Sequence, residues 1–370
     1  MKKVLYLLII ISFTSCKNKT EHNSKSLTKN SIYEQTDAYV NKMMDSLGII
    51  GLNYAILLNK EVVHQKTFGL SNLDLQVAMK QDNLFPVASI SKLFSSTALN
   101  KLLKTKDRSI NETVGQILPE RTDLPLSWRN LTIKQLLSHT SGMPDQIDYQ
   151  IFLNPENDEF VIEALKDKPF VFEPNESTRY CATGFLLLRM VFEKVSGQNF
   201  EAYMKENYFE KFDLTSAEYG GFLKTIPNRV TSYRTVNGQL ELFPLGYSPS
   251  MYAAAGLNIN IEDLTKWIQY VLNEKIMNKE KLSTIWKPVI LNNGKPGYFG
   301  LGWETYKLKN NIWMTGHGGA GISSVRHYWK TDSDETVTII LLTNGARNWL
   351  QTPDDINMTI ANYFMSGVID

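Results

Sequence analysis

The chain has 370 residues, of which 43% are hydrophobic and 21% are charged. This is an ordinary globular composition, which allows a large buried core and room for two lobes. The 39 Lys and Arg residues balance the 38 Asp and Glu residues to a net charge of +1, and no basic run is interleaved with aromatic residues. Nucleic acid is therefore not an expected partner, and a small or neutral ligand is favoured.

The N-terminus has the features of an export signal. Two lysines precede the apolar stretch 4–11, which is too short to cross a bilayer and therefore predicts a signal peptide. Small residues before Cys16 resemble a lipoprotein signal, which implies that residues 1–16 direct export of a periplasmic or cell-envelope lipoprotein that is lipidated on Cys16. Phe13 replaces the usual aliphatic residue, so a plain signal peptide with an incidental cysteine is the alternative. The polar residues 17–30 predict a flexible tether.

Strand-like segments predominate at both ends of the folded part, residues 31–370. Apolar residues recur at helical spacing over 32–47, and the apolar, partly β-branched runs 50–58 and 62–68 predict a hairpin. Towards the C-terminus the sequence predicts strands at 299–306, 311–315, 322–330 and 335–343 and a last helix at 354–365.

The middle of the chain is helical in character, with predicted helices at 89–104, 132–138, 159–165, 184–196, 200–211 and 262–273. Strands at both ends and helices between them predict an α/β fold with one antiparallel sheet built from the two chain ends. The sheet lobe is expected over about 31–87 and 290–370, and the inserted helical lobe over about 88–289.

A serine and a lysine with catalytic spacing begin the first of these central helices. Ser89 and Lys92 are three residues apart, so on a helix they share a face and the amine can take the proton of the hydroxyl. The same spacing occurs at Ser26 and Lys29 in the polar tether, but only Ser89 leads into an apolar helical stripe. The free N–H groups of a helix N-terminus favour an anion near Ser89 and an uncharged Lys92. A capping serine beside a solvated lysine is the alternative.

Three motifs follow one another along the chain: FPVASISK at 85–92, LTIKQLLSHTSGMP at 131–144 and GHGG at 316–319. Together they resemble the penicillin-recognising serine hydrolases, which include class C β-lactamases, D-Ala-D-Ala carboxypeptidases and family VIII-type esterases. The resemblance extends from about residue 33 to the end of the chain. It implies a β-lactamase/transpeptidase-like fold and a hydrolase that forms an acyl-enzyme on Ser89.

The resemblance also implies roles for a second segment. Tyr180 stands where this family has the tyrosine of a Tyr-x-Asn motif, and with Lys92 it would act as general base and acid. Ala182 stands in place of the asparagine, whose amide binds the acylamide of the substrate. Because a methyl group cannot form that hydrogen bond, we expect poor β-lactam hydrolysis and a preference for esters or unusual peptides.

The run from His317 to Ala320 is the third element that the resemblance implies. Gly318 and Gly319 would let the substrate backbone lie along the strand, and the N–H groups of Ala320 and Ser89 would form the oxyanion hole. His317 would contribute a hydrogen bond or a positive charge towards the substrate carboxylate or the Tyr180 oxygen. The loop 139–142 is expected to cap and turn the chain.

Other chemistries lack their motifs. The sequence has no Gly-x-Ser-x-Gly, His-Glu-x-x-His or P-loop string, so no cofactor and no metal are predicted. Two hypotheses remain. The first is a serine hydrolase for a D-Ala-type peptide, a small ester or a β-lactam-like amide of cell-wall origin. The second is a substrate-binding or sensing lipoprotein that keeps the pocket without turnover, for which the missing asparagine is the motive.

Overall fold

The computed structural model describes residues 29–150, 157–221, 223–245, 247–348 and 350–368. The expected signal peptide, its Cys16 and nearly all of the tether lie outside the described residues. Within the described ranges, every helix is too short or too polar to cross a membrane.

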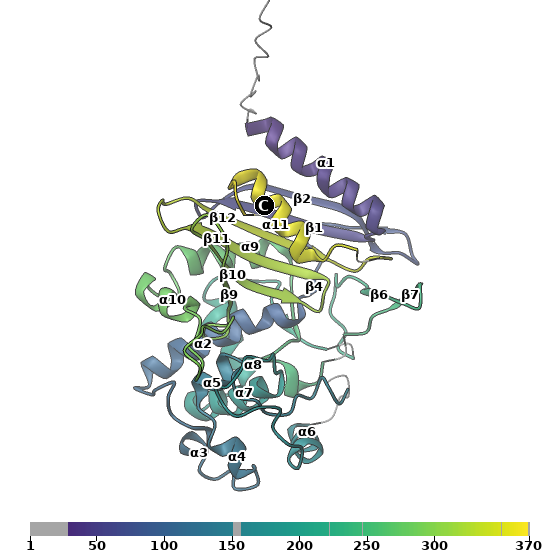
Figure 1. The fold of residues 1–370 in the computed structure, drawn as a ribbon. Helices are drawn as coiled ribbons and strands as arrows, with labels where there is room; N and C mark the ends of the chain where they lie inside the picture. Colours follow the sequence, from purple (N-terminus) through teal and green to yellow (C-terminus); the bar gives the residue numbers. More distant parts are fainter. Residues whose placement is uncertain (1–28, 151–156, 222, 246, 349, 369–370) are drawn as a thin grey trace, which may run out of the picture.

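An antiparallel sheet of seven strands, counted over the described residues, forms one layer of the molecule (Figure 1). Its order is β3-β2-β1-β12-β11-β10-β9. The strands are β1 (Gly51–Leu58), β2 (Glu61–Asn72), β3 (Val77–Ala78), β9 (Glu304–Lys307), β10 (Ile312–Gly319), β11 (Ser323–Lys330) and β12 (Thr336–Thr343). The predicted fold, an antiparallel sheet built from both chain ends and flanked by helices, is confirmed.

The two chain ends meet in the middle of the sheet. Strand β1 pairs with its hairpin partner β2 on one side and with β12 on the other, where Leu52 lies opposite Thr343. Alternation along β12 divides the core: Ile339 and Leu341 face one hydrophobic cluster, and Ile340 and Leu342 face the other. The sheet is therefore covered on both faces.

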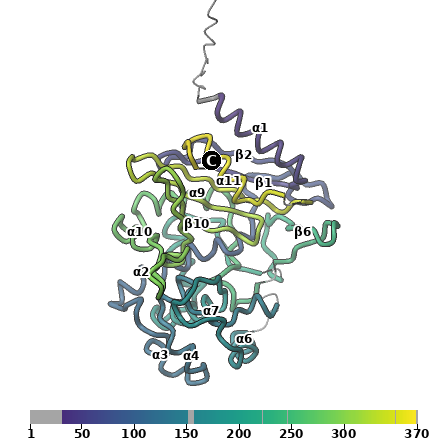
Figure 2. Tube along the Cα trace, viewed as in Figure 1, coloured from purple at the N-terminus to yellow at the C-terminus, as the bar shows by residue number. Residues whose placement is uncertain are grey.

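Helices α1 (Lys29–Leu47) and α11 (Pro353–Phe364) lie on one face of the sheet, where the purple and yellow ends of the chain come together in Figure 2. On the other face, α9 (Ile261–Leu272) contacts β1 and β12, and α2 (Ser91–Thr105) contacts β10. Phe94 of α2 stacks on Trp267 of α9 with 3.8 Å between ring centroids. This contact joins the two helices beneath the sheet.

The helical lobe continues away from that face. Its other helices are α3 (Val114–Ile117), α4 (Leu126–Arg129), α5 (Ile133–Leu137), α6 (Asp158–Leu165), α7 (Thr183–Ser196), α8 (Phe200–Met204) and α10 (Lys279–Trp286), with short turns η1 (Ala88–Ile90), η2 (Lys205–Glu210) and η3 (Pro249–Met251). Small sheets pair β4 (Phe85–Pro86) and β5 (Glu218–Tyr219) with β8 (Leu257–Ile259), and β6 (Tyr233–Val236) with β7 (Gln239–Leu242).

Several predicted boundaries differ from the structure. The strand expected at 311–315 continues through Gly319, because its glycines pair with β11 instead of ending the strand. Of the run 299–306, the part before Glu304 lies outside β9. The helix expected at 200–211 is α-helical only to Met204 and continues as the π-helical turn η2.

Candidate active site

Ser89 lies in η1, a single 3-10 turn between β4 and α2. The residues before this turn are anchored to β8, since the Val87 N–H donates to the Leu257 carbonyl at 3.0 Å. Ala88 has a φ of 47°, which is costly for a residue with a Cβ, and the Ser91 hydroxyl bonds its carbonyl at 2.6 Å. Ser89 itself is half-buried, and it makes no side-chain capping bond at the start of α2. The alternative of a simple capping serine therefore does not describe its contacts.

The structure brings Ser89, Lys92 and Tyr180 together. The Ser89 Oγ lies 2.5 Å from the Tyr180 hydroxyl, and Lys92 Nζ donates to the same hydroxyl at 2.5 Å. The distance from Lys92 Nζ to Ser89 Oγ is 3.4 Å. The Tyr180 hydroxyl thus lies between the serine and the lysine, within hydrogen-bond distance of both, where a proton could pass between them.

Burial makes Lys92 suitable as a base. Its side chain is wholly inaccessible to solvent, and this burial lowers the pKa of its ammonium group to about 7, against the opposing effect of the Asp145 carboxylate. Burial also raises the pKa of Tyr180 well above its usual value. Near neutral pH the amine therefore exists partly as the free base, while the phenol keeps its proton.

A backbone carbonyl, that of Ala254, is a second hydrogen-bond acceptor for the lysine. Lys92 Nζ donates to this carbonyl at 2.8 Å. Ala182, which stands in place of the asparagine, is completely buried at the start of α7. The role of this carbonyl could not be predicted from residue type, because a backbone acceptor has no sequence signature.

Asp145 is a residue that the sequence analysis missed. One of its carboxylate oxygens accepts the N–H groups of Ala182 at 2.9 Å and Thr183 at 3.2 Å, so it caps α7 directly after the tyrosine. It follows the Thr-Ser-Gly loop by three residues, and this position after a family loop motif was the available signal.

His317 takes a more limited role than expected. It is 3% exposed, and this burial lowers the pKa of its imidazole to about 4, so the ring is neutral at pH 7. Its Nδ1 lies 2.6 Å from the Gly318 carbonyl oxygen, which can only accept, so Nδ1 carries the proton. The described contacts of the Tyr180 hydroxyl are with Ser89 and Lys92. Among the described residues His317 thus offers neither a positive charge nor a bond to the tyrosine oxygen, and its expected hydrogen bond towards a substrate stays a prediction.

The glycines of β10 let the strand pack closely against the serine segment. A Cβ on Gly319 would lie 2.4 Å from the Val87 carbonyl oxygen, so only glycine allows this approach. Ala320 is exposed, with a φ of 48° in the turn after β10. Among the described residues, neither the Ala320 N–H nor the Ser89 N–H donates to a backbone carbonyl.

An ion cluster around the buried Arg326 supports β10 from the opposite face of the sheet. Glu304 of β9 and Arg326 of β11 are the cross-strand partners of Gly316, and their side chains pair with each other. Arg326 also binds Asp354 of α11 in a bidentate manner, at 2.8 and 2.9 Å. The sequence analysis missed this cluster, because its members come from three separate elements.

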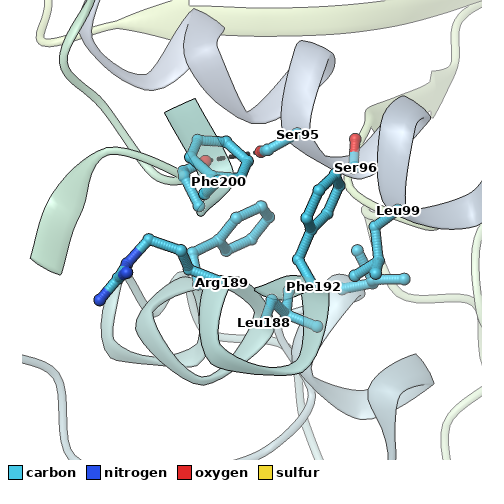
Figure 3. A pocket seen from close by; sticks show the side chains of 10 residues that line it. Ser95, Ser96, Leu99, Leu188, Arg189, Phe192 and Phe200 are labelled. Carbon is cyan, nitrogen blue, oxygen red and sulfur yellow. Dashed lines mark hydrogen bonds between the residues drawn. The ribbon is translucent and has the colours of Figure 1, made fainter. Parts of the chain in front are cut away.

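A small apolar pocket lies behind the site, between α2, α7 and α8 (Figure 3). Its wall includes Phe192 and Phe200, and the Ser95 hydroxyl donates across it to the Ala253 carbonyl at 2.6 Å. Ser89, Lys92 and Tyr180 do not line it. We therefore assign this pocket to the packing of the helical lobe.

Comparison with known proteins agrees with this geometry. Residues 36–362 match the Beta-lactamase family. The chain therefore belongs to the beta-lactamase family of serine hydrolases, and the resemblance stated from the motifs is confirmed.

Individual relatives are distant. Penicillin-binding protein 4* of Bacillus subtilis is 24% identical over 77% of this chain, and the chain spans 66% of that protein's length. The solved structure of the hydrolase EstCE1, which has promiscuous acyltransferase activity, superposes with a TM-score of 0.73 at 17% identity, covering 90% of this chain and 98% of its own. D-amino acid amidase from Ochrobactrum anthropi SV3 superposes with a TM-score of 0.71 at 19% identity, covering 92% and 97%. These two structures show the shared fold.

The pKa of Lys92 predicts the pH dependence of any turnover. Because the amine must be unprotonated to accept the serine proton, kcat/KM for a p-nitrophenyl ester should fall as pH drops through about 7. Well below that pH the fall should approach about tenfold per pH unit. Lys92→Arg, which stays charged, should be inactive at every pH. A flat profile between about pH 5 and pH 8 contradicts the assignment of Lys92 as base.

Removing the phenol hydroxyl should slow acylation without unfolding the protein. Tyr180→Phe deletes the atom that bridges Ser89 and Lys92, so single-turnover acylation by the same ester should slow by about 10²–10⁴-fold. Tyr298→Phe is the matched control, because its hydroxyl bonds the Thr178 carbonyl at 3.3 Å and does not touch the serine. Equal acylation rates in the two variants would eliminate the bridge.

Proposed function

We propose that this protein hydrolyses a D-Ala-type peptide, a small ester or a related amide through an acyl-enzyme on Ser89. The observation that carries the proposal is the contact chain from the Ser89 Oγ through the Tyr180 hydroxyl to Lys92 Nζ, with 2.5 Å at each step. A half-buried hydroxyl next to a fully buried amine supports nucleophilic catalysis, because an adjacent base can activate the hydroxyl.

The proposed reaction begins with neutral Lys92. As the Ser89 Oγ attacks the substrate carbonyl carbon, its proton passes to the Tyr180 oxygen while the Tyr180 proton passes to Lys92. The N–H groups of Ser89 and Ala320 receive the oxyanion, and neither has a competing backbone acceptor among the described residues. When the intermediate collapses, the alcohol or amine leaves with the proton returned through Tyr180. Water then attacks the acyl-enzyme, and the same groups move its proton to the Ser89 oxygen.

Two features support esters and small amides over β-lactams. The methyl group of Ala182 offers no hydrogen bond to an acylamide, and β10 contributes a neutral His317 in place of a cation for a carboxylate. The names of the structural neighbours, an acyl-transferring hydrolase and an amidase for D-amino acids, support the same classes.

The proposed location is the cell envelope, with a lipid on Cys16 and a substrate derived from the cell wall. The apolar stretch 4–11 and the small residues before the cysteine support it. Cells expressing the full chain should incorporate labelled palmitate into the protein, and Cys16→Ser should abolish the label. A labelled Cys16→Ser variant would rule out this anchor.

Activity-based labelling tests the proposed chemistry. The full chain should react with a fluorophosphonate probe, and intact mass should show one adduct that peptide mapping assigns to Ser89. Ser89→Ala should lose the adduct, while Ser283→Ala, which changes an exposed serine of α10, should keep it. No adduct on the wild-type chain would favour the second hypothesis, a binding or sensing lipoprotein.

A further inference from the structure

His139 is in contact with three consecutive residues around the catalytic tyrosine. Its carbonyl accepts the Arg179 N–H at 2.9 Å, and its Nδ1 accepts the Cys181 N–H at 3.0 Å. Its ring lies against the Tyr180 ring, with 4.7 Å between the centroids. One buried side chain and its own carbonyl therefore fix the backbone on both sides of the tyrosine and the ring between them.

We propose that His139 is a positioning residue, which holds the Tyr180 hydroxyl between Ser89 and Lys92. This inference rests on the proposed function of these three residues. It extends the role expected for the loop 139–142, which was to cap and turn the chain. The loop does close α5, since the His139 N–H donates to the Leu136 carbonyl at 3.3 Å.

The imidazole cannot move away from this position. The ring of Phe299 meets it edge-on at 4.4 Å, and the ring of Phe185 stacks at 5.4 Å. His139 is completely buried, and its φ of 55° shows that the backbone is held in a left-handed conformation that is uncommon outside glycine. Such strain persists only where the surroundings enforce it.

The protonation state of His139 follows from the same contact. The Cys181 N–H is a donor, so Nδ1 must be unprotonated and the proton of the neutral ring lies on Nε2. Burial lowers the pKa of the His139 imidazole well below its usual value, and the nearby Lys92 acts in the same direction. Two N–H groups would face each other if Nδ1 were protonated. The residue thus acts as a hydrogen-bond acceptor and an aromatic wall.

Neighbouring residues of the loop hold other parts of the same segment. The Thr140 carbonyl accepts the Asn175 N–H at 2.8 Å. The Asp145 carboxylate caps α7 by accepting the N–H groups of Ala182 and Thr183. These contacts anchor the segment before and after the tyrosine. Of these three loop residues, only His139 packs its ring against the Tyr180 ring. A substitution of His139 therefore tests the position of the tyrosine most directly.

The test compares His139→Ala and His139→Asn with the wild-type chain. Asn suits the left-handed backbone and carries a carbonyl oxygen near the position of Nδ1, so it restores the acceptor without the ring. His327→Asn is the matched control, because His327 is also buried among aromatic rings and binds the Thr338 hydroxyl at 2.8 Å, but in β11 away from the tyrosine. Circular dichroism gives the folded fraction of each variant, and rates are expressed per folded molecule.

His139→Ala should lower both the rate of fluorophosphonate labelling and kcat for an ester by about 10²-fold, because a small misplacement of a catalytic group has that effect. KM should change little, since substrate binding is not removed. His139→Asn should recover about tenfold of the loss, and His327→Asn should stay within about twofold of the wild type.

The possible failures are distinct. A wild-type chain that does not label at Ser89 would overturn the proposed function and, with it, the role of His139. A wild-type chain that labels together with a folded His139→Ala that labels equally fast would overturn the positioning role alone. A loss in His139→Ala that the folded fraction fully explains, without rescue by Asn, would also overturn it.

Discussion

The site depends on the removal of Lys92 from water. A pKa of about 7 in place of the ordinary 10.5 means that the charged amine is disfavoured by roughly 5 kcal/mol relative to water. The buried amine is still hydrogen-bonded, because it donates to the Ala254 carbonyl and to the Tyr180 oxygen. Neither of these groups is a counter-ion that would stabilise the charged form. An adjacent carboxylate would restore the charge and remove the base.

The side chains around Lys92 keep water away from its amine. Phe185 and Tyr180 place their rings within 5.1 and 4.7 Å of the amine nitrogen and exclude water from it. The two nearby imidazoles, His139 and His317, are neutral because they are buried, so they add no cation beside the lysine. The acidic groups of the ion cluster pair with Arg326 on the other face of the sheet. The site is thus dry on its lysine side, where Asp145 is the acid whose effect opposes burial, and it is partly open to solvent at the serine.

Much of this arrangement could be predicted from the sequence. The contacts that could not be predicted depend on the main chain or on residues that only the fold brings together. Ser89, Lys92 and Tyr180 stand in local motifs, and hydrophobic alternation revealed most strands of the sheet. The contribution of Ala254 comes from a main-chain carbonyl, and Asp145 is one acidic residue among many, so residue type alone indicates neither. His139 was recognised as part of a motif but given only a turn-forming role, because its contacts with the tyrosine depend on a fold that joins positions 40 residues apart in the chain. Strand ends were misjudged where glycine, usually a break, pairs within β10.

The pairing of β1 with β12 has a consequence for how the protein is made. Strand β1 is synthesised long before β12, its partner on one side, because the helical lobe lies between them in the sequence. Until then the β1–β2 hairpin exposes an unpaired apolar edge, which is a site for aggregation. The centre of the sheet can form only after β12 has been synthesised, so it depends on a long-range contact of the kind that slows folding. A product that lacks β12 would lose the centre of the sheet, and with it the placement of β11 and β10, which pack against the turn that carries Ser89.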